Sequence, residues 1–299
     1  MLTRIISGAV GAALLAVVLV FHDTIVLPAA VAVIICIMLF ELLRAVKLEK
    51  CLPILIAVEG CGIAMPILYS YYYYVEKAEK MDCVVRNVKI DGVVTLAAFA
   101  ITLAAAFIVF VTWLKKHKEI RYEQVFFALA AMVLVPQAMS TMVRIDRMNE
   151  EHGLFLLIMG LCGAWIADTG AYFTGVAFGK HKLCPEISPK KTIEGFIGGI
   201  TFTGIAYAVA FSLRSGFTAE RAAIAFVIGA VCAVIGTVGD LSASMVKRQI
   251  GFKDYGKIMP GHGGLMDRFD SVLFVLPTFY IMIAVVEEIL EDNGAGILG

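Results

Sequence analysis

The sequence predicts an all-α fold: a polytopic membrane helical bundle of about nine transmembrane helices, with a polar site that faces the cytoplasm. Three observations support this prediction. Hydrophobic residues make up 60% of the 299 residues and charged residues only 17%, which excludes an ordinary soluble domain. Most hydrophobic residues lie in long apolar runs. One charged, glycine-rich stretch, residues 244–270, lies between two such runs, where a membrane protein would keep its polar site.

Nine apolar runs are long enough to cross about 30 Å of hydrocarbon as helices. The first run follows Arg4 like a signal sequence, but no convincing small-residue cleavage site follows it and a second run begins almost at once. We therefore expect it to be a retained helix. The runs lie at residues 5–21, 24–43, 52–74, 93–114, 124–143, 154–178, 193–213, 221–239 and 269–289.

The distribution of Lys and Arg predicts the orientation, because basic residues near helix ends resist translocation. With nine helices, 17 of the 25 basic residues lie on the side of the N-terminus and 8 on the other side. We therefore expect a protein integral to the cytoplasmic (inner) membrane, with its N-terminus and active site facing the cytoplasm and its C-terminus outside. The formal net charge of zero suggests no nucleic-acid partner. The loops on the cytoplasmic side are 44–51, 115–123, 179–192 and 240–268.

The chain is predicted to be a single integral membrane domain, since no fixed-period repeat or low-complexity linker divides it. Residues 1–150 hold mostly plain apolar helices and are predicted to be a scaffold. Residues 151–299 hold glycines and charges at membrane depth and are predicted to be the catalytic region. Glu59 is an oddity of the first half. An intramembrane carboxylate is often functional, but no basic residue shares its run, and a hydrogen bond to a neighbouring helix explains it more simply.

Asp168 lies in the middle of the sixth apolar run, among small residues that include Gly163, Gly170 and Gly175. A carboxylate at that depth must face a polar cavity, a cation or a partner, although capping by a hydroxyl such as that of Thr169 is an alternative. We expect a polar cavity. Small residues also let helices approach closely, which is compatible with a homodimer, but the same faces could pack within one chain.

A basic loop precedes the seventh run and leads into a helix that starts near Thr192. Basic side chains beside a helix start could bind phosphate, because that end offers free amides and the positive end of the helix dipole. Taken alone, the loop would favour contact with anionic lipid. Beside the charged segment that follows, we interpret Lys190 and Lys191 as phosphate-binding residues.

The eighth run ends at Asp240. If its helix continues, Asp240, Ser244 and Lys247 fall at positions i, i+4 and i+7, which share one helix face. A carboxylate, a hydroxyl and an ammonium group then point into one space. Further basic residues around this segment could neutralise phosphate charge, and they are Arg248, Lys253, Lys257 and Arg268.

The chain then breaks at Pro260 and is predicted to restart as a helix that carries Asp267, Arg268 and Asp270. Glycines before the restart allow close backbone approach to a ligand, and the new helix N-terminus favours an anion. Asp240 and Asp267, from helix ends that flank this loop, suit Mg²⁺, which takes one or two protein carboxylates together with phosphate oxygens and water. Asp168 and Asp270 are further candidate ligands, and a second metal ion is compatible with this set.

His262 lies between two glycines of the same loop, and three readings of it stay open. It could act as a general acid, bind a metal, or simply donate a hydrogen bond to phosphate. We weigh the last role, a hydrogen bond to phosphate, equally with the other two roles combined.

The stretch from Ser244 to Asp270 resembles the signature of the phosphatidate cytidylyltransferases, also called CDP-diacylglycerol synthases. Met259 stands where the family tends to have Leu, Ile or Phe, and it is likewise apolar. The resemblance is strong over about 160–271, where segments around Asp168 and over 187–199 also match family blocks, and is compatible through hydropathy over the first half. So long a set of fixed polar and glycine positions is far more specific than a lone glycine motif. The matching residues are Ser244, Lys247, Arg248, Lys253, Asp254, His262, Gly263, Gly264, Asp267, Arg268 and Asp270.

The resemblance implies a Mg²⁺-dependent enzyme that makes CDP-diacylglycerol and pyrophosphate from CTP and phosphatidic acid. We expect a phosphate oxygen of phosphatidic acid to attack the α-phosphorus of CTP. This oxygen is already ionised at neutral pH, because phosphate monoesters have a second pKa of about 6, so a dedicated general base is dispensable. Catalysis then depends on alignment and charge neutralisation. The predicted catalytic residues are Asp240, Asp267, Lys247, Arg248 and His262, and the predicted phosphate-binding residues are Lys190, Lys191, Lys253, Arg268, Ser244, Gly263 and Gly264.

Three alternatives were open at the level of sequence. An ion-coupled transporter also has intramembrane Asp and broken glycine-rich helices, but no inverted repeat is visible and the charges collect in loops. A phosphoalcohol transferase that consumes CDP-lipids would carry a DGxxAR signature, which this sequence lacks. A related transferase that uses an isoprenoid-ether lipid stays open, because no pattern in the sequence indicates which lipid tails the protein recognises.

Overall fold

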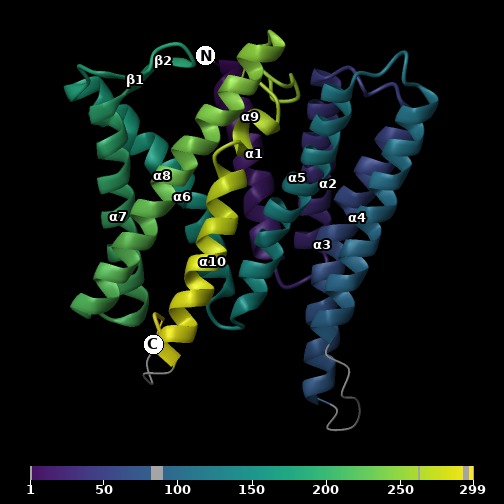
Figure 1. The fold of residues 1–299 in the computed structure, drawn as a ribbon. Coiled ribbons are helices and arrows are strands. Elements are labelled where there is room, and N and C mark those ends of the chain that lie inside the picture. The colour runs from purple at the N-terminus through teal and green to yellow at the C-terminus, as the bar shows by residue number, and fades with distance from the viewer. Residues whose placement is uncertain (1, 82–89, 262, 292–295, 299) are drawn as a thin grey trace. The chain divides into compact units, whose positions relative to one another are not determined.

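Long helices dominate the described part of the chain, as the apolar runs predict (Figure 1). The structure is a computed structural model, and it describes residues 2–81, 90–261, 263–291 and 296–298. Eight of the helices in these ranges are long and apolar enough to cross a membrane. The first predicted span differs, since its apolar helix, Ile6–Val20, is shorter than the others. The prediction of an all-α membrane bundle is confirmed.

The chain divides into two units that do not follow the sequence halves. The first unit comprises Met1–Met148 together with Asp254–Asp267, and the second comprises Asn149–Lys253 together with Arg268–Gly299. The segment of residues 254–267, called the 254–267 loop below, is therefore part of the unit built from the N-terminal helices. Part of the predicted site therefore belongs to the same unit as the N-terminal helices, which the sequence predicted to be a scaffold.

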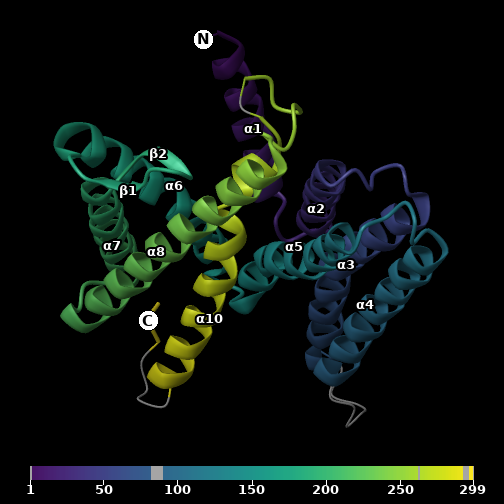
Figure 2. The ribbon, with the colours of Figure 1, turned by 45° about the horizontal axis from the view of Figure 1, so that its top comes forward.

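The first unit is built around α3, which packs against α2, α4 and α5 (Figure 2). Its core contains fully buried apolar side chains such as Ile35, Ile54 and Met139. Glu59 of α3 shares a hydrogen bond with Cys36 of α2, in line with a structural role. The helices are α1 (Leu2–Val20), α2 (Val26–Ala45), α3 (Leu52–Met81), α4 (Ile90–Lys115) and α5 (Tyr122–Met148).

The second unit is built around α7, which packs against α6 and α8, while α10 packs against α8 and α6. The hydroxyl of Tyr207 donates to the carbonyl oxygen of Met159 at 2.7 Å, so this fully buried phenol has a partner. The helices are α6 (Gly153–Phe178), α7 (Ile193–Ser215), α8 (Ala219–Ile250) and α10 (Val272–Glu291), and the single turn α9 (Met266–Phe269) lies where the two units join in sequence.

Glycines let α6 and α7 approach closely, as the sequence predicts. A Cβ at Gly199 would lie 2.8 Å from the carbonyl oxygen of Ala167, and one at Gly195 would lie 2.7 Å from that of Ala171. These small-residue faces are therefore used within the second unit. The homodimer stays a prediction, and these two glycines do not contribute to its support.

A short β-hairpin connects α6 to α7, where the sequence led us to expect a plain loop. Strands β1 (Lys182–Cys184) and β2 (Ser188–Thr192) pair antiparallel, with Lys182 opposite Thr192 and Cys184 opposite Ser188. The hairpin ends where the Thr192 hydroxyl accepts a hydrogen bond from the backbone N–H of Gly195 at 3.1 Å and caps α7. The basic segment therefore has a fixed backbone at the start of a helix.

The helix expected after the glycines is interrupted. Asp267 and Arg268 lie in the single turn α9, but Asp270 follows that turn and α10 begins only at Val272. The Asp270 carboxylate accepts from the N–H of Ser271 at 2.8 Å. A side chain that takes a backbone donor in this way competes with the helical hydrogen bond. The prediction of one continuous helix that carries all three residues is therefore wrong.

Candidate functional site

The polar face predicted on the eighth helix is confirmed. Asp240, Ser244 and Lys247 all lie in α8, and the Ser244 hydroxyl donates to Asp240 Oδ1 at 3.4 Å. Lys247 is 8% exposed, and a Lys this buried is normally paired with an acidic group. Its Nζ lies 4.0 Å from Oδ2 of Asp270. α8 ends at Gly251 in the left-handed conformation, with φ of 85°.

The hairpin places Lys191 against this face. Neighbouring residues in a strand point to opposite sides, and β2 separates its two lysines in this way. Lys191 Nζ forms an ion pair with Asp240 Oδ2 at 2.5 Å, whereas Lys190 is exposed. The hairpin and the C-terminal end of α8 accordingly lie at the same end of the second unit (Figure 1). The structure thus joins two predicted site residues that are 49 positions apart in sequence.

Three carboxylates of the second unit interact electrostatically: Asp168 of α6, Asp240 of α8 and Asp270 before α10. The positive charges of Lys191 and Arg268 both interact electrostatically with the Asp168 carboxylate. The charged groups around Asp168 make its surroundings polar, as expected of a carboxylate in an apolar helix. Repulsion among the carboxylates is offset by the nearby cations. This region can therefore attract a metal ion through its acids and a phosphate through its basic residues.

Asp267 belongs to the first unit, where its carboxylate orders the 254–267 loop. Oδ2 accepts from the backbone N–H groups of Tyr255 at 2.8 Å and Gly264 at 2.9 Å. The N–H of Gly264 is thus directed at a protein carboxylate, and its predicted role in phosphate binding stays a prediction. Gly263 has a φ of +89°, which favours glycine, and its carbonyl oxygen accepts from the N–H of Met259 at 3.0 Å.

Three of the predicted phosphate ligands, Arg248, Lys253 and Arg268, have exposed side chains, so a ligand can reach them. His262 lies outside the described residues. Asp240 and Asp267, the predicted pair of metal ligands, belong to different units. Their joint role as metal ligands stays a prediction.

Glu41 is a residue of this region that sequence reasoning missed. It lies in α2 and is 1% exposed. Its two carboxyl oxygens accept from the N–H groups of Leu265 at 3.1 Å and Met266 at 2.9 Å. The available signal was the same one that drew attention to Glu59, a carboxylate inside an apolar run.

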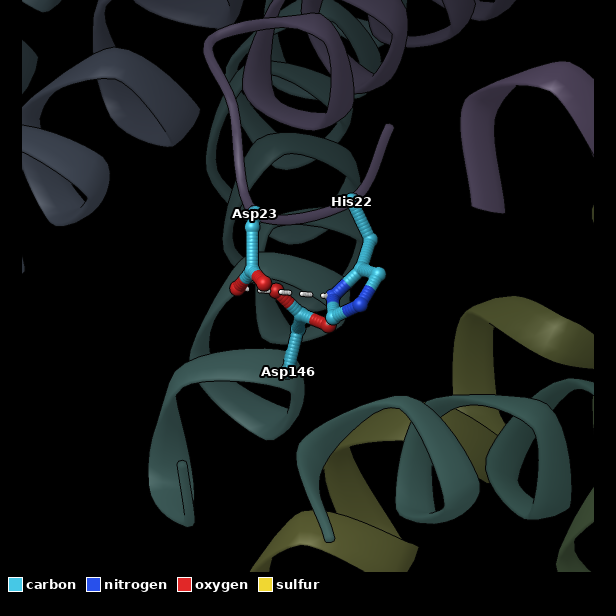
Figure 3. A group of neighbouring side chains, drawn as sticks. All are labelled: His22, Asp23 and Asp146. Atoms are coloured by element: carbon cyan, nitrogen blue, oxygen red, sulfur yellow. Dashed lines mark hydrogen bonds and ion pairs between the residues drawn. The ribbon is translucent and has the colours of Figure 1, made fainter. Parts of the chain in front are cut away.

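A second polar cluster, formed by His22, Asp23 and Asp146, was also not predicted (Figure 3). Among the described residues, these three form the group whose ligand atoms lie within 4.8 Å of one another and could hold a metal ion. Figure 3 shows the His22 ring facing the Asp146 carboxylate, with Nδ1 2.7 Å from Oδ1. The Asp146 side chain is fully buried.

Arg147 already supplies a cation to this cluster. Its guanidinium lies 3.1 Å from Asp23 Oδ1 and 3.5 Å from Asp146 Oδ2. It also lies over the rings of Tyr73 and Tyr74, at 4.9 and 5.6 Å from their centres, in cation–π geometry. The cluster therefore ties α5 to the loop after α1 and to α3 through its own charges.

The donor chemistry of the second unit suits Mg²⁺ better than the His22 cluster does. Mg²⁺ prefers oxygen ligands and retains several waters, and Asp168, Asp240 and Asp270 offer only carboxylate oxygens. The His22 cluster offers an imidazole nitrogen beside a guanidinium. The donor type of the predicted residues thus suits the predicted ion, whereas among the described residues it is the His22 cluster that brings three ligand atoms within 4.8 Å of one another.

Known proteins resemble this chain over most of its length. Residues 2–286 match the model of the Cytidylyltransferase family. A phosphatidate cytidylyltransferase of Bacillus subtilis (strain 168) is 35% identical over 249 residues, which cover 82% of this chain and 84% of that protein. A phosphatidate cytidylyltransferase of Haemophilus influenzae (strain Rd) is 44% identical over 133 residues, or 44% of this chain and 46% of that protein. One of Staphylococcus haemolyticus is 43% identical over 140 residues, or 45% of this chain and 51% of that protein.

Proposed function

Because this chain belongs to the cytidylyltransferase family, we propose that it transfers CMP from CTP to phosphatidic acid and so makes CDP-diacylglycerol and pyrophosphate. A phosphate oxygen of phosphatidic acid forms a bond to the α-phosphorus of CTP. The bond from that phosphorus to the bridging oxygen of the β-phosphate breaks, and pyrophosphate leaves with the electron pair. No proton has to be removed from the nucleophile, because a phosphate monoester is largely ionised at neutral pH.

One observation carries this proposal: the ion pair of Lys191 with Asp240, within electrostatic range of Asp168. These charged groups come from a hairpin and two long apolar helices. Charged residues in apolar helices are rare, pair with one another and often mark the pathway or site of a polar ligand. A nucleotide triphosphate and a lipid phosphate are ligands that need both cations and metal-binding acids.

The basic residues have the task of neutralising and aligning phosphates. Lys191 and Lys247 each lie beside a carboxylate, which keeps their ammonium groups in place before substrate arrives. Arg248, Lys253 and Arg268 have exposed side chains that can bind phosphate oxygens. Alignment of two anionic substrates is the main requirement of this reaction, and fixed cations provide it without reorganisation.

The acidic residues would hold Mg²⁺, with Asp240 and Asp267 as the proposed ligands and Asp168 and Asp270 as further ones. A bound Mg²⁺ supplies charge stabilisation for the phosphates and for the leaving pyrophosphate. The electrostatic coupling of Asp168 and Asp270 with Asp240 supports giving them a share in this task. A second metal ion is compatible with this number of carboxylates.

The location of the site suits a lipid substrate. The eight apolar helices make the chain an integral membrane protein. With α1 as a ninth span, its basic loops favour a cytoplasmic site and N-terminus with the C-terminus outside. A diacyl lipid keeps its tails in hydrocarbon and its phosphate at the interface. A site at the end of α8 could therefore take the phosphate of a lipid that stays in the bilayer.

The test is an assay of the purified protein in lipid nanodiscs with α-³²P-labelled CTP and phosphatidic acid. We expect label in the lipid fraction with Mg²⁺ and none with EDTA. Asp240→Asn should lose this activity, whereas Glu220→Gln, which changes an exposed carboxylate at the opposite end of α8, should retain it. Absence of lipid-linked cytidylate with the wild-type protein under all conditions would exclude the proposed activity.

A further inference from the structure

Glu41 is buried between two glycines of the 254–267 loop. A Cβ built at Gly256 would lie 2.5 Å from the carboxyl carbon of Glu41, and one at Gly264 would lie 2.6 Å from it. Any side chain at either position would collide with that carboxyl group. The two glycines are therefore needed where the loop backbone closes around Glu41.

The hydrogen bonds of Glu41 offset the cost of its burial. A carboxyl group taken out of water is strongly destabilising unless it is hydrogen-bonded. Glu41 accepts from Leu265 N and Met266 N, one bond to each of its oxygens. α2 thus holds the C-terminal end of the loop.

Arg44 holds the other end of the loop from the next turn of α2. Its guanidinium donates to the carbonyl oxygen of Tyr255 at 2.7 Å, while the N–H of Tyr255 donates to Asp267. The backbone of Tyr255 is therefore bonded through both of its polar groups. Two side chains of one helix, Glu41 and Arg44, fix both ends of the loop that carries the predicted phosphate-binding glycines.

We propose that Glu41 is a positioning residue: it holds the 254–267 loop against α2 in the conformation that the reaction requires. This inference rests on the proposed function, because the loop matters for catalysis only if Asp267 and its glycines act on CTP. It gives part of the N-terminal half a task in catalysis without contact with substrate. Arg44 contributes to the same positioning through its hydrogen bond to the Tyr255 carbonyl oxygen.

The proposal is tested with Glu41→Gln, which keeps the side-chain size but turns an NH₂ group toward a backbone donor. Glu59→Gln is the matched control, since Glu59 is also a carboxylate in a membrane helix of the same unit and bonds Cys36 instead. Trypsin cleavage after Lys253 or Lys257, which are exposed in or beside the loop, should accelerate at least tenfold in Glu41→Gln and stay unchanged in Glu59→Gln.

The kinetic part of the test separates positioning from general loss of fold. In Glu41→Gln, kcat/KM for CTP should fall at least tenfold while the KM for phosphatidic acid changes less than threefold. Equal loss in Glu59→Gln, or unchanged cleavage and kinetics in Glu41→Gln, would overturn the proposal. If the wild-type protein makes no CDP-diacylglycerol, the proposed function fails, and the cleavage rates still decide whether Glu41 holds the loop.

A measurement on the wild-type protein covers the case in which Glu41→Gln does not fold. Hydrogen–deuterium exchange followed by mass spectrometry should show the amides of Leu265 and Met266 exchanging at least a hundredfold more slowly than those of exposed Lys253 and Asp254. Exchange of all four amides at the same rate would contradict the proposed hold on the loop.

Discussion

Lys191 and Asp240 form an ion pair, with Nζ 2.5 Å from Oδ2, that joins the β-hairpin to α8. Both side chains are about one quarter exposed, at 24% and 26%, so water and a ligand can reach them. An ion pair that is this accessible adds little to stability. Its value lies in holding an ammonium group and a carboxylate side by side at the place where a phosphate and a metal ion are expected.

Replacement of Lys191 by Met should lower kcat by about 100-fold, the size expected when one fixed group that stabilises developing charge is removed. Lys190→Met should have a smaller effect, because Lys190 is exposed on the other side of the strand. The measurement is CMP transfer to phosphatidic acid at saturating CTP. Equal effects of the two substitutions would mean that the hairpin contributes only overall positive charge.

Substitution of Asp168 by Asn should raise the Mg²⁺ concentration needed for half-maximal activity about tenfold, the effect typical of a weakened metal environment. Asp168 is coupled electrostatically to Asp240, and the neutral amide removes that contribution to cation binding. Activity is measured as a function of free Mg²⁺, with EDTA-treated wild-type protein as the starting point. Asp23→Asn serves as the control, because the Asp23 carboxylate pairs with Arg147 in the other unit. This substitution should leave the Mg²⁺ concentration for half-maximal activity unchanged.

Replacement of Asp146 by Asn should lower the free energy of unfolding by about 3 kcal/mol, because it leaves the buried guanidinium of Arg147 less well compensated. The Arg147 side chain is only 6% exposed. Glu151→Gln removes an exposed ion pair with Arg214 and should change the same quantity by less than about 1 kcal/mol. Denaturant titration in detergent micelles measures both. Similar losses for the two variants would show that the His22 cluster does not stabilise the first unit.

Gly199→Ala should destabilise the second unit by about 1–3 kcal/mol, the usual cost of overpacking, since the added Cβ meets the backbone of α6. Gly60→Ala is the matched control. It adds the same methyl group to a helix, but nothing lies within 4 Å of its Cβ. Ala is the better helix former, so Gly60→Ala should be neutral or slightly stabilising. Thermal unfolding of both variants tests the close approach of α6 and α7.

The sequence could predict the helices and the face of α8, because both follow from local periodicity: apolar length marks a span, and i, i+4, i+7 spacing marks a face. It could not predict the pairing of Lys191 with Asp240, although it identified both residues. Glu41 was out of reach for a different reason. Its partners are backbone N–H groups more than 220 residues away. Nearly every residue type has a backbone N–H group, so the sequence does not mark which ones are partners.

The hairpin was missed because its strands are short and basic, without the alternation of apolar residues that marks a half-buried strand. The break after α9 was missed because the interrupting bond, from Ser271 to Asp270, is made by a side chain that can also sit within a helix. Short strand length thus explains the first correction, and local competition between a side chain and the backbone explains the second.

The length of α8 has a consequence for the placement of Asp240. Its 32 residues extend about 48 Å at 1.5 Å per residue, against about 30 Å of hydrocarbon. Asp240 comes about 32 Å after the start of this helix. One residue inserted before Asp240 would shift its polar face by about 1.5 Å and turn it by about 100°. The length of the apolar part of α8 therefore determines both the position of Asp240 along the helix and the direction in which its carboxylate meets Lys191.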